Sequence, residues 1–292
     1  MKPADAALAV LTSVIWGIAF VATRIALDSF SPPQLTALRF LIACLPVLFL
    51  PRPRISWRQL ILIGLTLFAG QFLLMFFAFD NGLPPGVASV TQQMQAFFTV
   101  GLAAAFLGEM PTLRQGVGMA MAFAGLILIG STVDGELRAL GLVLAMGAAL
   151  SWAIGNILVK RVGDVSMVAL VAWLSLVPPI PALAVAAVYD PHPFLISQLL
   201  AASWMSLVAA LYLGAISTIL AYAIWGHLLA RYQAATVAPF ALLTPCVGVA
   251  GSALVFGEVS GPVRYAGMLL VFGGLAVIIL PAGLKIVALG KR

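Results

Sequence analysis

The sequence consists almost entirely of apolar segments long enough to cross a lipid bilayer. A hydrocarbon core about 30 Å thick requires a helix of about 20 apolar residues. Ten segments between breaks of proline, glycine and charge meet or approach this length, and their connections are too short for a soluble domain. They are 6–27, 34–50, 59–79, 86–107, 112–130, 137–159, 167–188, 204–228, 233–256 and 262–282. The pattern predicts an all-α polytopic membrane protein with ten transmembrane helices.

The composition agrees with this prediction. Apolar residues make up 63% of the 292 residues and charged residues 8%, against roughly 45–50% and about 25% in soluble proteins. So few charges cannot cover a water-facing surface, which excludes a soluble enzyme, a nucleic-acid-binding protein and a disordered chain. The net charge is +6 without any cluster of four Lys or Arg residues, so no nucleic-acid partner is expected. The expected partners are a small-molecule substrate and the lipid bilayer.

The positive charges predict the orientation in the membrane. With ten spans, both termini lie on one side, and eleven Lys and Arg residues fall on that side. Three fall on the opposite side, and Arg39 lies inside the second segment. Because positive residues favour the cytoplasmic side, both termini are predicted to be cytoplasmic.

The chain also contains an internal repeat. The stretch WGIAFVATR at 16–24 is matched by WAIGNILVK at 152–160. Gly108-Glu109, Gly118 and Gly125 are matched, 149 residues later, by Gly257-Glu258, Gly267 and Gly274. Two matched blocks in the same order predict a duplication, with repeats at 1–133 and 134–292. Each repeat holds five spans, an odd number, so the repeats must cross the membrane in opposite senses. This 5+5 inverted-topology repeat is a recurring architecture of secondary transporters.

The ten-span inverted duplication, the Trp16-Gly17 pair and the Gly-Glu pairs after helices four and nine resemble the EamA-type branch of the drug/metabolite transporter superfamily. The chain is most similar to bacterial exporters of amino acids and related metabolites, including the aromatic amino-acid exporters. The resemblance covers essentially the whole chain. It implies a central cavity lined by helices one, three, four, six, eight and nine, with helices five and ten at the periphery.

The function expected from this resemblance is that of a secondary transporter in the bacterial inner membrane. It would export amino acids, above all apolar or aromatic ones, and similar neutral or zwitterionic metabolites by alternating access. The alternative is an exporter of lipophilic cations or drugs, in which Asp80 carries the charge. Asn81-Gly82 follows Asp80 and predicts that this acid lies at the external end of its helix. Because no dedicated proton relay is visible, uniport, or coupling through a site that the sequence does not reveal, is the more economical mechanism.

An enzyme is not expected, because membrane enzymes need clustered His, Asp, Glu or Lys residues and the chain has only two, distant, histidines. No metal or other cofactor is expected. A monomer and a homodimer both remain open, because the glycines of helices five and ten pack helices either within one chain or between subunits.

Helix four is predicted to supply polar groups to the cavity. Gln92, Gln95 and Thr99 share one face at spacings i, i+3 and i+7, whereas Gln93 points elsewhere on a regular helix. Polar groups are costly in hydrocarbon and face the bundle interior or a wet cavity. Interhelical hydrogen bonding is the alternative role for these glutamines.

Further candidates come from other helices. Trp16 and Trp152 lie in mid-span rather than at the interface that tryptophan prefers, which favours either a cavity wall or ordinary packing. Asn156, Tyr222 and Thr244 complete the predicted substrate-binding set.

Two prolines and one arginine are singled out for other roles. Pro239 and Pro245 each remove a backbone hydrogen bond and are predicted to form a hinge or gate in helix nine. Arg39 either extends outward to the membrane surface or pairs inside the protein. With so few buried cations, a phosphorylated substrate is not expected.

Overall fold

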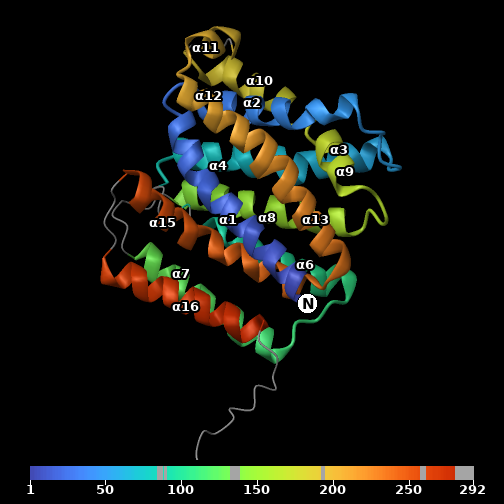
Figure 1. Ribbon diagram of the computed structural model, residues 1–292, viewed down its shortest axis with the longest axis vertical. Helices are drawn as coiled ribbons and strands as arrows, with labels where there is room; N and C mark the ends of the chain where they lie inside the picture. The colour runs from blue at the N-terminus through green and yellow to red at the C-terminus, as the bar shows by residue number, and fades with distance from the viewer. Residues whose placement is uncertain (84–87, 89–90, 132–138, 192–194, 257–260, 280–292) are drawn as a thin grey trace, which may run out of the picture.

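The computed structural model describes residues 1–83, 88, 91–131, 139–191, 195–256 and 261–279, and within these ranges its regular structure is entirely helical (Figure 1). The helices of the first part are α1 (Pro3–Ala26), α2 (Pro32–Cys44), η1 (Leu45–Leu48), α3 (Trp57–Ile63), η2 (Gly64–Gly70), α4 (Gln71–Asp80), α6 (Met94–Leu107) and α7 (Leu113–Gly130). Those of the second part begin with α8 (Ala139–Lys160), α9 (Met167–Leu174), α10 (Pro179–Tyr189) and α11 (Leu195–Ala201). They continue with α12 (Trp204–Leu211), η3 (Tyr212–Leu220), α13 (Ala221–Arg231), α14 (Ala234–Val237), η4 (Ala238–Leu243), α15 (Thr244–Phe256) and α16 (Pro262–Ile279).

The helices match the predicted apolar segments. Seven helical stretches of the described chain are long and apolar enough to cross a membrane, and three shorter apolar helices accompany them. The seven are Pro3–Ala26, Trp57–Asp80, Leu113–Gly130, Ala139–Lys160, Met167–Tyr189, Trp204–Arg231 and Ala234–Val255; the three are Pro32–Leu48, Met94–Leu107 and Pro262–Ile278. Each lies on one of the ten predicted segments. The chain is therefore an all-helical, multi-pass membrane protein.

Several helices begin earlier than the sequence pattern predicted. Helix α2 starts at Pro32 rather than residue 34, with a capping box between Ser31 and Gln34. The predicted start was wrong because proline was read as a break. In the first turn of a helix the missing proline N–H costs nothing, and its fixed φ suits the helix.

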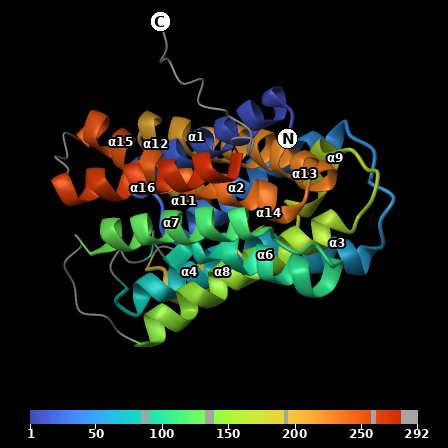
Figure 2. The ribbon, with the colours of Figure 1, turned by 90° about the horizontal axis from the view of Figure 1, so that it is seen from below.

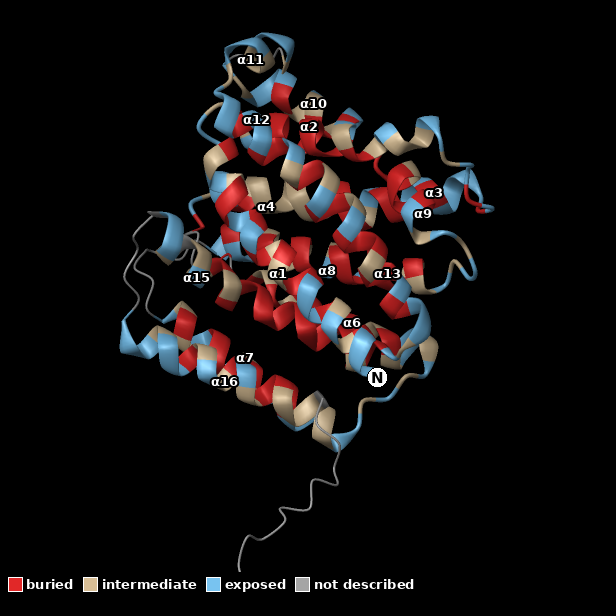
Figure 3. Ribbon diagram, in the orientation of Figure 1, coloured by how far each residue is buried: buried red, intermediate tan, exposed pale blue. Residues whose placement is uncertain are grey.

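Helix α11 was not predicted, because residues 189–203 were expected to form a connection. Leu195, Leu199 and Ala202 follow a helical spacing and pack against a cluster that includes Phe30 and Leu213. This packing supplies the free energy that a seven-residue helix lacks on its own. The outer face of α11 stays exposed (Figure 3).

Two of the membrane helices widen from α to π geometry in their middle. Segment η2 interrupts the helix between α3 and α4, and η3 interrupts the helix between α12 and α13. A π segment shifts the backbone hydrogen-bond pattern and leaves a carbonyl available to another partner. The Ser151 hydroxyl donates to the carbonyl oxygen of Thr66 in η2 at 2.7 Å. The Trp16 indole N–H donates to the carbonyl oxygen of Ser217 in η3 at 3.1 Å.

Each π segment holds a glycine against a neighbouring helix. A β-carbon at Gly64 would lie 3.0 Å from the carbonyl oxygen of Leu174 and would also overlap Val177. A β-carbon at Gly214 would lie 2.8 Å from the carbonyl oxygen of Arg39 and would overlap Ile42. The absence of side chains at both glycines therefore lets α9 and α2 approach the π segments closely.

Helices α7 and α16 pack along each other at the edge of the bundle (Figures 1 and 2). Gly118 faces the backbone of Gly274, and Gly125 faces the backbone of Gly267, so closely that a β-carbon at any of the four would overlap the opposite carbonyl oxygen. Small residues at a helix crossing permit this approach in membrane proteins. These glycines therefore pack two helices of the same chain.

The core lies where α1, α8 and α13 cross in the middle of the bundle (Figure 3). Trp152 and Trp225 are the largest side chains that are fully buried there. Large apolar side chains on the outer faces are exposed, such as Leu254 at 88%. Exposed apolar side chains of this kind suit helices that face lipid chains.

We expect Gly125→Val to destabilise the protein, because its side chain would overlap the backbone of α16. Overpacking of a tight contact costs about 1–3 kcal/mol. Gly116→Val on the same helix is the matched control, since no atom lies within 4 Å of a β-carbon at that position. Thermal unfolding in detergent should show a lower Tm for Gly125→Val than for Gly116→Val. Equal Tm values would contradict the tight crossing.

Candidate functional site

A cavity of about 900 Å³ lies inside the bundle, and its wall comes from both parts of the chain. Its volume is at the upper end of the usual range for small-molecule sites. The lining residues are Trp16, Ala19, Phe20, Thr23, Arg24, Leu27, Asp28, Pro32, Leu35, Thr36, Arg39, Gln71, Phe72, Met75, Phe76, Phe79, Leu83, Ala88, Gln92, Gln93, Gln95, Trp152, Leu213, Ser217, Tyr222 and Thr244. The cavity thus reaches the exposed residues at the end of the bundle where α1 ends. We call this the outer end and the opposite one, which holds the N-terminus, the inner end.

An aromatic cluster forms the floor of the cavity. The Trp16 ring lies 6.1 Å from that of Trp152, 5.1 Å from Tyr222 and 5.0 Å from Trp225 between centroids. The Trp152 indole N–H donates to the Tyr222 hydroxyl at 3.3 Å. Tilted and edge-on contacts of this kind stabilise aromatic clusters beyond the area they bury. Trp16, Trp152 and Tyr222 therefore lie on the cavity wall, and their role in substrate binding stays a prediction.

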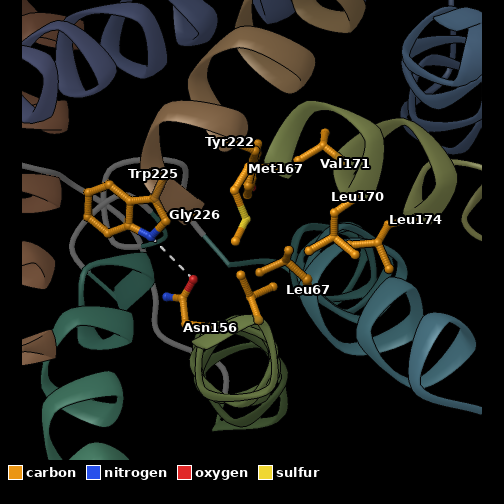
Figure 4. Close-up of a pocket in the computed structure, with 10 residues that line it drawn as sticks. Leu67, Asn156, Met167, Leu170, Val171, Leu174, Tyr222, Trp225 and Gly226 are labelled. Atoms are coloured by element: carbon orange, nitrogen blue, oxygen red, sulfur yellow. Dashed lines mark hydrogen bonds between the residues drawn. The ribbon is translucent and has the colours of Figure 1, made fainter. Parts of the chain in front are cut away.

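Two other predicted residues lie beneath this floor. The buried Asn156 accepts a hydrogen bond from the Trp225 indole N–H at 3.2 Å (Figure 4). Its amide donates to the hydroxyl of Thr99 at 3.3 Å, and that hydroxyl donates to the Gln95 carbonyl oxygen. Asn156 and Thr99 are thus hydrogen-bonded to protein groups and do not reach the 900 Å³ cavity.

The space beneath the floor is almost filled. A void of about 10 Å³ remains between Asn156, Tyr222 and the apolar side chains of Leu67, Leu170 and Leu174 (Figure 4). Such a volume is about that of one water probe. The structure therefore has a wide cavity on one side of the aromatic floor and a packed region on the other. Trp225 is not among the predicted residues, because nothing in the pattern of α13 distinguishes it from a lipid-facing aromatic residue.

The three glutamines of helix four all line the cavity. Gln92 donates through its amide to the Gln95 side-chain oxygen at 3.0 Å. The expectation that Gln93 points elsewhere is wrong. The chain makes a turn at Gln93 and α6 starts only at Met94, so the regular helical spacing does not hold there. Within the described part of the chain, the side-chain oxygens of Gln93 and Thr244 are buried without a hydrogen-bond partner.

Arg39 is buried in the wall and does not extend to the surface. Its side chain is 7% exposed. Its Nε donates to the Thr218 hydroxyl at 2.7 Å, and Nη2 donates to the Ser217 hydroxyl at 3.0 Å. Asp80, in contrast, is exposed at the end of α4 and does not line the cavity. Of the two alternatives for Arg39, the structure therefore has the inward one, with hydroxyl partners.

The two predicted hinge prolines lie in the ninth predicted span, 233–256, where the structure has the irregular succession of α14, η4 and α15. Pro239 is in the first turn of the 3₁₀ segment η4, and Pro245 is in the first turn of α15. Both are buried. Their positions explain why the helix changes geometry there, since neither can donate a backbone hydrogen bond. A hinge function for them stays a prediction.

A polar network joins helix ends at the inner end. Lys160 forms an ion pair with Glu109 at 3.0 Å and donates to the carbonyl oxygens of Leu229 and Tyr232. The Glu109 carboxylate also accepts from the backbone N–H of Ala234 at 2.8 Å. The ends of α6, α8 and α13 are thereby held together. We call Glu109, Lys160 and their partners the inner network.

These features define a class of protein: a multi-pass helical membrane protein with a small-molecule cavity open toward one end and packed shut toward the other. No group of three His, Cys, Asp or Glu residues that could hold a metal occurs in the described ranges. The profile of the EamA-like transporter family matches residues 5–131 and again residues 139–280. The chain belongs to this family, and it is a transporter rather than an enzyme.

The relatives cover almost the whole chain. A probable amino-acid metabolite efflux pump of Salmonella typhimurium is 37% identical over 95% of both chains. A protein of Escherichia coli with the same description is 36% identical over the same shares. A probable terminal-alkyne amino-acid exporter of Streptantibioticus cattleyicolor is 26% identical over 92% of this chain and 91% of its own length. A crystal structure with 18% identity has the same fold, with a TM-score of 0.82 over 96% of this chain and 99% of the other.

The cavity wall differs in one respect from the family expectation. Helix two contributes Pro32, Leu35, Thr36 and Arg39, although the resemblance did not place it on the cavity. Helices α7 and α16 contribute no residue of the described wall, and they lie at the edge of the bundle (Figure 1).

We expect Glu109→Gln to open the inner end, because Lys160 loses its ionic partner. Hydrogen bonds to charged groups contribute about 1.5–3 kcal/mol, and a free-energy change of 1.4 kcal/mol is about tenfold in an equilibrium constant. A thiol at Val159, which lines the void beneath the floor, reports the opening. In a Cys44→Ser, Cys246→Ala, Val159→Cys protein in detergent, Glu109→Gln should raise the rate of maleimide labelling about tenfold.

The control for this measurement is Arg58→Gln, because Arg58 is exposed. Arg58→Gln should leave the labelling rate unchanged. Equal rates in Glu109→Gln and the unmodified background would show that the inner network does not keep this end closed.

Proposed function

We propose that the protein is a secondary carrier that exports amino acids and similar neutral or zwitterionic metabolites across the bacterial inner membrane by alternating access. One observation carries this proposal: the 900 Å³ cavity, walled by both parts of the chain, is open toward the outer end, and the region beneath its floor is packed toward the inner end. An alternating-access carrier needs one state that is open to one side of the membrane and a second state that is open to the other side. The names of the relatives, which describe amino-acid metabolite efflux and amino-acid export, support the substrate class.

We further propose that the fold is a 5+5 inverted repeat of ten spans, divided at residues 133 and 134. The family profile matches the chain twice, in 5–131 and 139–280. The contacts support the same division. Gly118 faces Gly274 and Gly125 faces Gly267, which are the partners that a two-fold axis would give to glycines repeated at an interval of 149 residues.

The irregular segments support the repeat independently. The π segments η2 and η3 lie in the third and eighth predicted spans, 59–79 and 204–228. Gly64 and Gly214 occupy matching places in these two spans. Gly64 contacts Leu174 and Val177 on helix seven, and Gly214 contacts Arg39 and Ile42 on helix two. Matched residues of the two repeats are 135 or 136 positions apart in the first two helices. In the later helices they are 149 or 150 positions apart. Helix α11 lies in the second repeat where this interval changes.

The orientation follows from the charge distribution. In the predicted topology eleven of the Lys and Arg residues belong to the side of the termini, which supports a cytoplasmic location for both termini. The inner end is then cytoplasmic and the cavity faces the outside. The structure is therefore interpreted as an outward-open state, from which an exported substrate would leave.

The wall composition favours apolar and aromatic amino acids over lipophilic cations. The partly exposed Trp16 offers an aromatic face to an apolar side chain, with the buried rings of Trp152 and Tyr222 packed behind it, while the partly exposed Gln92 offers hydrogen bonds. Cation export gains no support from Asp80, which lies away from the cavity wall. Asp28 is on the wall but is exposed, and the buried charged residue among the lining residues is the cationic Arg39.

The proposed function is tested by uptake into proteoliposomes. We expect saturable uptake of radiolabelled leucine, phenylalanine or tryptophan, with counterflow exchange, and no requirement for a pH gradient. Counterflow separates a carrier from a channel, because it requires a site that alternates between the two sides. Absence of flux for every amino acid above that of empty liposomes would overturn the proposal. Flux of tetraphenylphosphonium alone would favour the cation alternative.

We expect Gln92→Ala and Trp152→Ala to lower this uptake, by loss of a hydrogen bond and of an aromatic wall. Each loss should raise the KM by about two- to tenfold, because such contacts contribute about 0.5–1.5 kcal/mol. Trp204→Ala, at an exposed site (72%), is the control and should leave the KM unchanged. Comparable membrane yields would exclude a folding defect, and normal uptake in both variants would contradict the cavity assignment.

A further inference from the structure

A guanidinium group is buried in the wall of the cavity without a carboxylate beside it. Arg39 is 7% exposed, and no carboxylate oxygen of the described residues lies within 4.0 Å of its nitrogen atoms. A buried charge without an ionic partner is costly, and ionisable groups inside membrane proteins are for that reason mostly functional. Two hydroxyls and an aromatic face compensate the charge only in part.

The contacts of Arg39 hold it in one place and leave part of it free. Nε and Nη2 donate to the hydroxyls of Thr218 and Ser217, whereas Nη1 donates to no described residue. The Phe72 ring covers the guanidinium, with Cζ 4.7 Å from the ring centroid. Thr218 in turn donates to the Leu213 carbonyl oxygen, five residues earlier, which fixes its hydroxyl. An arginine whose guanidinium is held through Nε and one N–H of Nη2 keeps further N–H donors at Nη1 and Nη2 for a planar anion.

We propose that Arg39 binds the carboxylate of the substrate and is the residue that selects carboxylate-bearing substrates. This inference rests on the proposed function, since it assigns the polar end of the exported amino acid. The carboxylate supplies the missing negative charge and accepts hydrogen bonds from the free N–H groups. The open side of the cavity gives the substrate access to this position.

The same wall also carries hydrogen-bond acceptors, the opposite of the N–H donors of Arg39. The side-chain oxygens of Gln93 and Thr244 are buried without partners among the described residues, and both residues line the cavity. Buried acceptors of this kind normally have a hydrogen-bond partner. Both oxygens are buried, so a shift of either side chain is needed to present the acceptor to a substrate ammonium group. Gln93 and Thr244 are therefore the candidate partners of the ammonium group of a zwitterion whose carboxylate binds Arg39.

This assignment predicts discrimination by chemistry rather than by size. An amino-acid amide or a decarboxylated amine keeps the side chain and the amino group but presents no anion to Arg39. Sites built to pair a polar group reject analogues that lack it, because the buried partner is then left unpaired.

The experiment compares binding of phenylalanine, phenylalaninamide and 3-phenylpropionate to the purified protein in detergent, followed by tryptophan fluorescence. In the wild type we expect phenylalanine to bind at least tenfold more tightly than phenylalaninamide. Arg39→Gln should abolish this difference, mainly by weakening phenylalanine. Arg39→Lys keeps the charge without the planar fork and should retain part of the preference.

The outcomes separate this inference from the proposed function. If Arg39→Gln binds phenylalanine as the wild type does, or keeps the preference over the amide, the carboxylate assignment is wrong while the export function stands. If the wild type binds 3-phenylpropionate in an Arg39-dependent manner but neither binds nor transports any amino acid, the anion site stands and the proposed function fails. Arg39→Lys with the wild-type Tm serves as the folded comparison should Arg39→Gln unfold.

Discussion

A peptide group in hydrocarbon has no water to bond with, and this constraint governs where the helices can be irregular. Regular helices satisfy their own backbone, so departures from α geometry are tolerated only where another helix or a cavity supplies the missing partners. The π segments η2 and η3, the turn at Gln93 and the 3₁₀ segment η4 all occur on helices that line the cavity or its floor. The outer pair, α7 and α16, has no such irregularity in its described length.

The same constraint explains how charge is distributed. Lys160 and Glu109 lie at the inner end, where each is partly exposed and pairs with the other and with backbone groups. Arg39 lies deeper, and its described partners are neutral hydroxyls. A charge that closes one end of the bundle is thus neutralised by the protein itself. A charge on the cavity wall is left for the substrate to neutralise, which turns the cost of burial into selectivity.

The sequence predicted the membrane helices more completely than the residues of the cavity. Apolar length located the membrane segments, because hydrocarbon thickness fixes helix length with little regard to detail. Trp16, Trp152, Gln92 and Gln95 were found because polar and aromatic groups in mid-span are costly or unusual. Helical spacing failed at Gln93, where the helix is interrupted. Thr99 and Asn156 lie beneath the aromatic floor and not on the wall of the 900 Å³ cavity, because their side chains bond to protein groups there, which neither spacing nor position in the span reveals. No local pattern announces a π segment, since it depends on the carbonyl partners that other helices supply.

Under the proposed repeat, the polar pocket around Arg39 has an apolar counterpart. Ser217 and Thr218 of η3 correspond to Leu67 and Phe68 of η2, and Arg39 corresponds to Leu174. Leu67 and Leu174 line the small void beneath the aromatic floor (Figure 4). The two halves therefore share a backbone geometry, while only the pocket between helices two and eight can hold a carboxylate.

This asymmetry bears on how the carrier alternates. Exchange of conformations between the halves would open the inner end without moving the carboxylate site to the other pocket, where Leu67 and Leu174 offer no donor side chain. The substrate would stay on Arg39 while access changes around it. A single anchored site reached in turn from each side is the arrangement that an exchange carrier requires, and it needs architectural symmetry but not chemical symmetry.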